Sequence, residues 1–291
     1  MPSGTLLVFG LGFSARVLVD RLVPAGWAVR ATVRDADRAA ALRAEGIDAL
    51  PFDGTAPVTD VLGLFEDVSH ILSSVPPGAD GDPVLIHHGG DIAARANEIA
   101  WAGYLSTTGV YGDRAGGWVD ETSDLAPATE RGRRRVAAEA GWCGLWRSAG
   151  LPVHLFRLAG IYGPGRNALK TVRAGQARRI VKPGQVFSRI HVADIATVLE
   201  ASIARPDPGA AYNVCDDDPA PPQDVVALAC ELLGVDPPPE IPFEAAEMSE
   251  MGRSFYAESK RVSNRRIKED LGVRLAYPGY RAGLAALLAE T

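Results

Sequence analysis

The sequence predicts an α/β fold, with a doubly wound parallel sheet and a small carboxyl-terminal lobe. Short apolar runs alternate with helical patterns through the first half of the chain, which is typical of the strand and helix units of a parallel sheet. The first run, residues 5–9 (TLLVF), is too short and continuous for an amphipathic helix and fits a strand buried on both faces. Gly10 and Gly12 separate this strand from a helical pattern that continues to Pro24. This order of strand, glycine turn and helix indicates a Rossmann-type fold.

The glycine turn is the predicted site for the phosphates of a dinucleotide. Gly10 would permit a tight reversal, Gly12 would let the backbone approach a pyrophosphate, and Ala15 would allow close packing of helix on strand. The amino terminus of the helix adds N–H groups and the positive end of its dipole. We therefore expect the cofactor to be contacted by Gly10, Gly12, Phe13, Ser14 and Ala15.

The end of the second predicted strand, residues 27–34 (WAVRATVR), favours NADP as the cofactor. A carboxylate at this position binds the ribose 2′-hydroxyl of NAD, whereas an arginine pairs with the 2′-phosphate of NADP. Arg34 stands at that end, and Arg38 follows one helical turn later. Asp35 and Asp37 follow immediately, so NAD remains the alternative cofactor. The alternative role for Arg34 and Arg38 is that of solvent-exposed residues at the start of a helix.

Three further strands are expected over residues 47–52, 68–75 and 101–110. Ligands of an open parallel sheet bind at the carboxyl ends of its strands. At these ends, Asp53 would either lie beside the adenine or form a turn, and Ser74 is expected to contact the cofactor. The hydroxyl of Thr107 falls at the same edge of the sheet.

The composition of the 291-residue chain is that of an ordinary globular protein, with 23% charged residues. Its net charge of −6 argues against a nucleic-acid partner, because phosphate neutralisation needs a basic surface. No apolar run approaches the roughly 20 residues that span a bilayer, so we expect no membrane partner and a cytoplasmic location. The three cysteines suggest neither a disulfide framework nor a zinc site, and the adjacent His87 and His88 face different directions. Residues 216–218 (DDD) are expected to form a strand-end turn, so no metal is predicted.

Several stretches of the chain carry a resemblance to a known family. They are the opening glycine turn and residues 105–112 (LSTTGVYG), 156–166 (FRLAGIYGPGR), 188–196 (SRIHVADIA) and 212–215 (YNVC). In these motifs and their order, the chain resembles an extended short-chain dehydrogenase/reductase of the NAD-dependent epimerase/dehydratase type, the group that includes nucleotide-sugar epimerases. The resemblance implies a Rossmann fold, NAD(P) binding and a substrate-binding lobe over the second half of the chain.

The catalytic pair that this resemblance implies is missing, which makes the chain an atypical relative. The family uses a Ser or Thr after the fifth strand and a Tyr-x-x-x-Lys pair on the next helix, where the lysine lowers the pKa of the tyrosine for proton exchange. Thr107 matches the Ser/Thr position, but Arg131 stands at the tyrosine and Arg135 at the lysine. Arginine stays charged and cannot act as a general acid. Arg135 can still hold the nicotinamide ribose, which needs only donors and charge.

Two phenols are candidates for the missing proton donor. Tyr111 lies four residues past Thr107, and Tyr162 lies in the loop after the next strand. Tyr111 is the favoured donor, and packing under cofactor or substrate is the alternative for both. The arginines at positions 131, 133, 134 and 135 are open to three interpretations: an anion clamp, a solvent-facing basic stripe or a nucleic-acid contact.

The expected organisation is a dinucleotide-binding domain over residues 1–165, completed by residues 190–215, and a substrate lobe over 166–189 and 216–291. Its substrate-binding candidates are Arg131, Tyr162, Arg166 and Arg189. We expect an epimerase- or reductase-like enzyme with a small anionic substrate, nucleotide sugars included. The alternative is a catalytically silent NADP-binding sensor. The oligomeric state is left open, a homodimer included.

Overall fold

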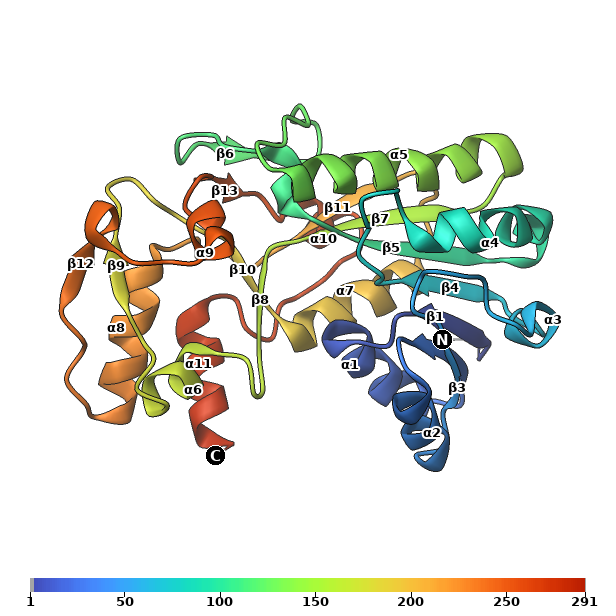
Figure 1. Cartoon of the computed structure of the whole chain (residues 1–291), viewed down its shortest axis with the longest axis horizontal. Coiled ribbons are helices and arrows are strands. Elements are labelled where there is room, and N and C mark those ends of the chain that lie inside the picture. Colours follow the sequence, from blue (N-terminus) through green and yellow to red (C-terminus); the bar gives the residue numbers. More distant parts are fainter. Residues whose placement is uncertain (1–2, 291) are drawn as a thin grey trace. The chain divides into compact units, whose positions relative to one another are not determined.

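The computed structural model describes residues 3–290, apart from the side chain of Met251. It contains a seven-stranded sheet in the order β11-β7-β5-β4-β1-β2-β3 (Figure 1). These strands are β1 (Thr5–Phe9), β2 (Ala28–Val33), β3 (Asp48–Pro51), β4 (His70–Ser73), β5 (Trp101–Thr107), β7 (Val153–Leu158) and β11 (Ala211–Val214). Strand β1 pairs in parallel with β2 and β4, and parallel pairing continues from β2 to β3 and from β4 to β5. The predicted doubly wound parallel sheet is therefore confirmed.

The described chain divides into two compact units. Unit 1 comprises residues 3–107, 133–157 and 196–212, and unit 2 comprises residues 108–132, 158–195 and 213–290. Residues 108–132 thus group with unit 2, whereas the sequence analysis assigned them to the dinucleotide-binding domain. The functional assignment of the two parts stays a prediction.

The helices of unit 1 cover both faces of the sheet. They are α1 (Phe13–Leu22), α2 (Ala36–Ala44), α3 (Val61–Leu64), α4 (Pro83–Ala94), η1 (Ala96–Glu98) and most of α5 (Glu130–Ala149) and α7 (Val192–Ala204). Figure 1 shows α4 and α5 on one side of the sheet and α1 and α7 on the other. Arg21 of α1 donates to Glu200 of α7 at 3.0 Å. Side-chain caps begin α2 and α4, where Asp35 accepts from Arg38 N at 2.7 Å and Asp82 accepts from Val84 N at 2.8 Å.

The apolar core of unit 1 lies between the sheet and its helices. Strand β1 is buried on both faces, as its continuous apolar run predicts, and residues 6–9 have no exposed surface. On the side of α4 and α5, the Tyr104 ring stacks on Trp142, with centroids 5.7 Å apart. Trp142 donates its indole N–H to Asp82 Oδ2 at 3.0 Å, so β5, α5 and the start of α4 are joined in one buried contact.

The fifth strand ends earlier than expected. The prediction of a strand over residues 101–110 is wrong at its carboxyl end, because β5 stops at Thr107 and residues Thr108–Tyr111 form the 3₁₀ helix η2. Gly112 follows with φ +71°, and a Cβ there would overlap the carbonyl oxygen of Ala126. The extended backbone of β5 therefore ends at the predicted Ser/Thr position, and the positive φ of Gly112 is one that favours glycine.

Unit 2 is built from short strands and helices. Its strands pair in parallel as β8 (Gly160–Tyr162) with β10 (Arg189–His191), β9 (Arg179–Val181) with β12 (Glu240–Pro242), and β6 (Trp118–Val119) with β13 (Arg261–Val262). Its helices are α6 (Ala168–Arg173), α8 (Pro222–Leu233), η3 (Phe243–Ala245), α9 (Glu250–Phe255), α10 (Arg265–Glu269) and α11 (Tyr280–Ala289). Its apolar core includes Tyr162, Leu169, Val225, Tyr280 and Leu284.

Within residues 3–290, no helix is both long and apolar enough to cross a membrane. The same residues contain no group of three or more His, Cys, Asp and Glu side chains placed to hold a metal ion. His87 and His88 contact different partners, as expected of adjacent helical residues: His87 Nε2 lies 3.0 Å from Gly54 O, and His88 Nδ1 lies 3.2 Å from Asp91 Oδ2.

Candidate functional site

The turn after β1 is a tight reversal that requires glycine at its first position. Gly10 has φ +82°, and a Cβ there would lie 3.0 Å from Val75 Cγ2. Gly10 N donates to Thr32 Oγ1 at 3.0 Å, and Leu11 N donates to Thr32 O at 2.9 Å. The turn is thus fastened to the end of β2, where cofactor choice is expected.

The second glycine leaves space at the start of α1. Gly12 is the N-cap of α1, and no side chain among the described residues caps this helix. A Cβ built on Gly12 would meet only Gly10 O, at 4.0 Å. Ser14 and Ala15 are buried against the sheet, whereas Phe13 is half-buried. An uncapped helix start beside open space fits the pyrophosphate of a dinucleotide.

Two further predicted cofactor residues stand at the ends of β3 and β4. The hydroxyl of Ser74 donates to Gly10 O and so braces the glycine turn. Asp53 Oδ1 accepts from Thr55 N at 2.8 Å and from Thr55 Oγ1 at 2.7 Å. Both hydrogen bonds lower the pKa of Asp53, and the bond from the backbone N–H of Thr55 has the larger effect. Asp53 therefore forms a local turn with Thr55, and its side chain is exposed at the end of β3.

Arg34, directly after β2, differs from Asp35 and Arg38 because its charged group has no partner among the described residues. Arg34 is exposed, and its guanidinium makes no hydrogen bond or ion pair to another described residue. The carboxylate of Asp35 is used as the cap of α2. Arg38 Nη1 lies 3.8 Å from Glu45 Oε1, so part of its charge is offset. At the expected 2′-phosphate position, Arg34 thus offers a cation that no group in residues 3–290 pairs with.

Arg135 is attached to the strand that carries Thr107. Arg135 Nη1 donates to Leu105 O at 2.7 Å and to Tyr104 Oη at 3.1 Å. Its guanidinium carbon lies 5.6 Å from the centroid of the Tyr104 ring. Burial raises the pKa of Tyr104, so this phenol stays protonated. The structure therefore brings Arg135 to the end of β5, where Thr107 is half-buried.

A buried ion pair supports the same strand end. Glu139 of α5 and Arg157 of β7 pair at 2.9 Å, with side chains only 4% and 7% exposed. Ser106 donates to Glu139 Oε1 at 2.5 Å. Removing one partner of such a pair leaves an uncompensated buried charge. These contacts hold the backbone just before Thr107 to α5 and β7.

In unit 2, Tyr111 is placed as a packing residue. Its side chain has no exposed surface, and its hydroxyl donates to Asn213 Oδ1 at 2.7 Å. Asn213 N in turn donates to Glu121 Oε1 at 2.7 Å. The phenolic proton is thus directed at an amide oxygen, which favours the packing alternative for Tyr111. The sequence offered no signal for the pairing of Tyr111 with Asn213, 102 positions away.

Tyr162 has a weaker polar contact. Its ring is nearly buried and meets the His191 ring edge to face, with centroids 5.2 Å apart. The hydroxyl donates to Gly279 O at 3.5 Å, a long hydrogen bond. Burial is the largest cause of its raised pKa, followed by the charge of Asp216. Tyr162 therefore keeps its proton at neutral pH.

Arg189 lies beside a buried carboxylate that sequence reasoning treated only as part of a turn. Arg189 Nη1 donates to Phe187 O at 3.0 Å and to Ala220 O at 2.9 Å, and burial lowers the pKa of the guanidinium. Asp216 Oδ1 accepts from Asp218 N at 3.2 Å, which gives the expected turn. Burial raises the pKa of Asp216 to about 7. Its Oδ2 is buried without a hydrogen bond to any described group.

The remaining substrate candidates of unit 2 are exposed cations. Arg131 lies in the first turn of α5 and Arg166 in the loop after β8. The backbone of Arg166 pairs with Gly163, with N–H to O distances of 3.0 and 2.9 Å. Arg131, Tyr162, Arg166 and Arg189 therefore all belong to unit 2, whereas Thr107, Arg135 and the cofactor candidates belong to unit 1.

The comparisons with known proteins agree with this fold. Protein YeeZ of Escherichia coli (strain K12) is 28% identical over 280 residues, which cover 93% of this chain and 95% of YeeZ. A functionally unknown conserved protein from Silicibacter pomeroyi DSS is 56% identical, with a TM-score of 0.90 over 99% of each chain. A dTDP-glucose 4,6-dehydratase from Bacillus anthracis str. Ames, in complex with NAD, has a TM-score of 0.78 at 15% identity, over 99% of this chain and 96% of the dehydratase. No protein-family model matches the chain.

The chain shares the Rossmann-type α/β fold of the dTDP-glucose 4,6-dehydratase, which is the fold that the resemblance in its sequence motifs implied. Within this fold, the chain belongs to the same family as the conserved Silicibacter pomeroyi protein.

Proposed function

We propose that the protein binds NADP and is an epimerase- or reductase-like enzyme acting on a small anionic substrate. The observation that carries the cofactor proposal is the turn at Gly10 and Gly12, where a left-handed glycine precedes an uncapped helix start with open space beside it. Gly10, Gly12, Phe13, Ser14 and Ala15 would hold the pyrophosphate. When bound, a nicotinamide cofactor supplies the capacity to accept and return a hydride.

The preference for NADP is supported by the charges at the end of β2. Arg34 offers an exposed, unengaged guanidinium, while Asp35 is committed to capping α2. A guanidinium pairs well with a phosphate and poorly replaces a carboxylate at a ribose hydroxyl. Arg38 would add positive charge at the same end. Ser74 and Asp53 complete the proposed cofactor set at the ends of β4 and β3.

Thr107 and Arg135 are the proposed catalytic residues of unit 1. Thr107 would orient the substrate oxygen, and Arg135 would hold the nicotinamide ribose. Arg135 suits this role because Leu105 O and Tyr104 Oη restrain its guanidinium through Nη1. It cannot deliver a proton at neutral pH. Tyr111 or Tyr162 would do so, and Tyr111 would first have to release Asn213.

The proposed substrate is anionic because the candidate binding side chains of unit 2 include three arginines. These are Arg131, Arg166 and Arg189. The fold is shared with a dehydratase that acts on dTDP-glucose, so nucleotide sugars are the first class to test. The binding role of Tyr162 would be to pack against the substrate beside these cations.

A catalytically silent NADP sensor is the second candidate function. It is favoured by the absence of the Tyr-x-x-x-Lys pair together with the buried hydrogen bond from Tyr111 to Asn213. A sensor would retain the glycine turn and Arg34 while lacking proton transfer.

A deuterium-transfer experiment separates the two functions. The protein is incubated with NADPH deuterated at the nicotinamide C4 position and 4-keto nucleotide sugars, whose carbonyl accepts the hydride, and the label in the sugar is followed. In parallel it is incubated with NADP⁺, which accepts a hydride, and ordinary nucleotide sugars, and the exchange of sugar protons with solvent is followed. The enzyme proposal predicts transfer or exchange that is lost in Thr107→Ala while cofactor binding remains. Phe substitutions at Tyr111 and at Tyr162, made separately, identify the phenol that supplies the proton. Cofactor binding without transfer or exchange across the panel would support the sensor instead.

A further inference from the structure

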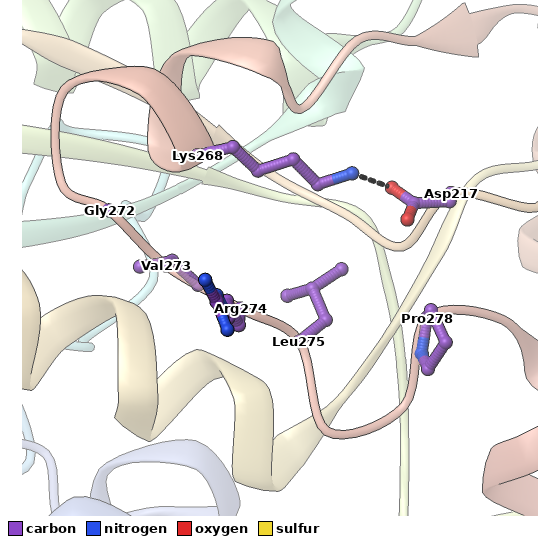
Figure 2. Close-up of a pocket in the computed structure, with 7 residues that line it drawn as sticks. All are labelled: Asp217, Lys268, Gly272, Val273, Arg274, Leu275 and Pro278. Atoms are coloured by element: carbon purple, nitrogen blue, oxygen red, sulfur yellow. Dashed lines mark hydrogen bonds and ion pairs between the residues drawn. The ribbon is translucent and has the colours of Figure 1, made fainter.

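A pocket of about 530 Å³ in unit 2 has no part in the function proposed above. It is lined by Asp217, Lys268, Gly272, Val273, Arg274, Leu275 and Pro278 (Figure 2). All of these residues come from the turn after β11, from α10 and from the loop between α10 and α11. The volume lies within the range of small-molecule sites, roughly 300–1,000 Å³.

On one side of the pocket, Lys268 and Asp217 form an ion pair. Lys268 Nζ donates to Asp217 Oδ1 at 2.5 Å, and Figure 2 shows this pair across from Arg274, Leu275 and Pro278. The same Asp217 oxygen accepts from Asn264 Nδ2 at 2.6 Å. The ammonium and the carboxylate therefore largely cancel each other at this side of the pocket.

The other polar group of the pocket is an uncompensated cation. Arg274 is exposed, and its guanidinium makes no hydrogen bond or ion pair to any side chain or backbone group that the structure describes. Beside it, Val273 is buried, Leu275 is half-buried, and Pro278 adds a further apolar surface. The pocket thus combines one net positive charge with an apolar wall.

Hydrogen bonds between protein groups hold the segments that line the pocket. Asp217 N donates to Pro278 O at 2.9 Å, and Val273 N donates to Ile267 O at 3.1 Å. The buried carboxylate of Asp194 accepts from Ala276 N at 2.8 Å. A preformed site loses less conformational entropy when it binds a ligand.

We propose that this pocket binds a small organic anion, in which a carboxylate or phosphate is attached to an apolar body. The anionic group pairs with the planar guanidinium of Arg274, which matches both chemistries through two parallel hydrogen bonds. The apolar body lies against Val273, Leu275 and Pro278. Asp217 opposes binding through its charge, and Lys268 offsets that opposition.

The test is a calorimetric titration of the full chain with phenyl phosphate, benzoate and inorganic phosphate. We expect phenyl phosphate to bind more tightly than inorganic phosphate, because only the former has an apolar body. Arg274→Ala should weaken binding by about tenfold or more, since a hydrogen bond to a charged group is lost. Asp217→Asn should strengthen it severalfold, because the amide keeps the acceptor oxygen and removes the opposing charge. Arg265→Ala is the matched control, since its side chain is 76% exposed on α10 and pairs with Glu269.

Arg274→Ala is expected to lower the affinity and Asp217→Asn to raise it. These opposite changes in affinity distinguish recognition of charge from general damage to the loop, which would lower the affinity in both variants. Tighter binding of phenyl phosphate than of benzoate assigns the site to phosphates, and the reverse order assigns it to carboxylates. The proposal is overturned if neither ligand binds at about 10 mM, if Arg274→Ala leaves affinity unchanged, or if Asp217→Asn weakens it. It is also overturned if Arg34→Ala, rather than Arg274→Ala, abolishes binding, because the ligand would then occupy the cofactor site.

Discussion

Arg135 donates a hydrogen bond to Tyr104 Oη at 3.1 Å, and its guanidinium carbon lies 5.6 Å from the centre of the Tyr104 ring. Arg135 stands at the position where relatives are expected to have lysine. Its side chain is therefore restrained by β5, the strand that ends in Thr107. Tyr104 is itself buried against Trp142, so it offers a rigid support. The contact with Tyr104 fixes the position of the Arg135 charge, as the proposed role in holding the nicotinamide ribose requires.

We predict that Arg135→Ala weakens NADPH binding by about tenfold or more, because a charge-assisted hydrogen bond to the ribose is lost. Tyr104→Phe removes only one of the two contacts that hold Arg135, since Leu105 O remains. It should therefore weaken binding by about threefold or less. Fluorescence titration of both variants provides the measurement. Equal losses in the two variants would contradict the role of Arg135 as the group that touches the cofactor.

The two glycines of the turn should respond differently to alanine. Gly12→Ala should leave the free energy of unfolding within about 1 kcal/mol of wild type, since φ is −100° and a Cβ meets only one atom, at 4.0 Å. It should nevertheless weaken dinucleotide binding, because the Cβ occupies the space assigned to the pyrophosphate. Gly10→Ala, at φ +82°, should destabilise the fold by about 1–3 kcal/mol. Chemical denaturation and cofactor titration measure the two effects; unchanged binding in Gly12→Ala would argue against the proposed cradle.

The buried pair of Glu139 and Arg157 should be a major support of the fold. Glu139→Gln leaves the Arg157 charge without its partner, and we expect a loss of about 3–5 kcal/mol in the free energy of unfolding. The matched control is Glu269→Gln in the exposed pair with Arg265, for which a change within about 0.5 kcal/mol is expected. Urea denaturation of the variants provides the comparison. A loss below about 1 kcal/mol in the free energy of unfolding of Glu139→Gln would contradict a major contribution of this pair to stability.

Asp216 should make stability depend on pH. Burial raises the pKa of this carboxyl from 3.8 to about 7 in the folded protein, so the folded state binds more protons than the unfolded state between these values. Its contribution to stability is therefore present below about pH 4 and is lost as the pH rises through 7. Asp216→Asn should be more stable than wild type at pH 8, by on the order of a few kcal/mol, and by much less at pH 4.

The measurement for Asp216 is the unfolding free energy of both proteins at the two pH values. Asp236→Asn, an exposed position, controls for the removal of one negative charge. An advantage of Asp216→Asn that is the same at both pH values would contradict the proposed titration.

The sheet and the glycine turn were predictable because their signals are local. The buried run of β1, the two glycines and Arg34 lie within one strand, helix and strand unit. The pairing of Tyr111 with Asn213 was not predictable, since the two residues are separated by 102 positions and the motifs that contain them give no information about contacts between them. The strand pairs of unit 2 escaped prediction because two or three residues are too few to show a periodicity. The buried environment of Asp216 was missed for a similar reason, since an acidic triplet ordinarily indicates an exposed turn.

The most direct test of the central claim is a fluorescence titration of NADPH and NADH against the wild-type protein and Arg34→Ala. We predict that wild type binds NADPH at least about tenfold more tightly than NADH, because the 2′-phosphate pairs with Arg34. Arg34→Ala should remove most of this difference while leaving NADH affinity nearly unchanged. Equal affinities of the wild-type protein for the two cofactors, or no binding of either, would contradict the account.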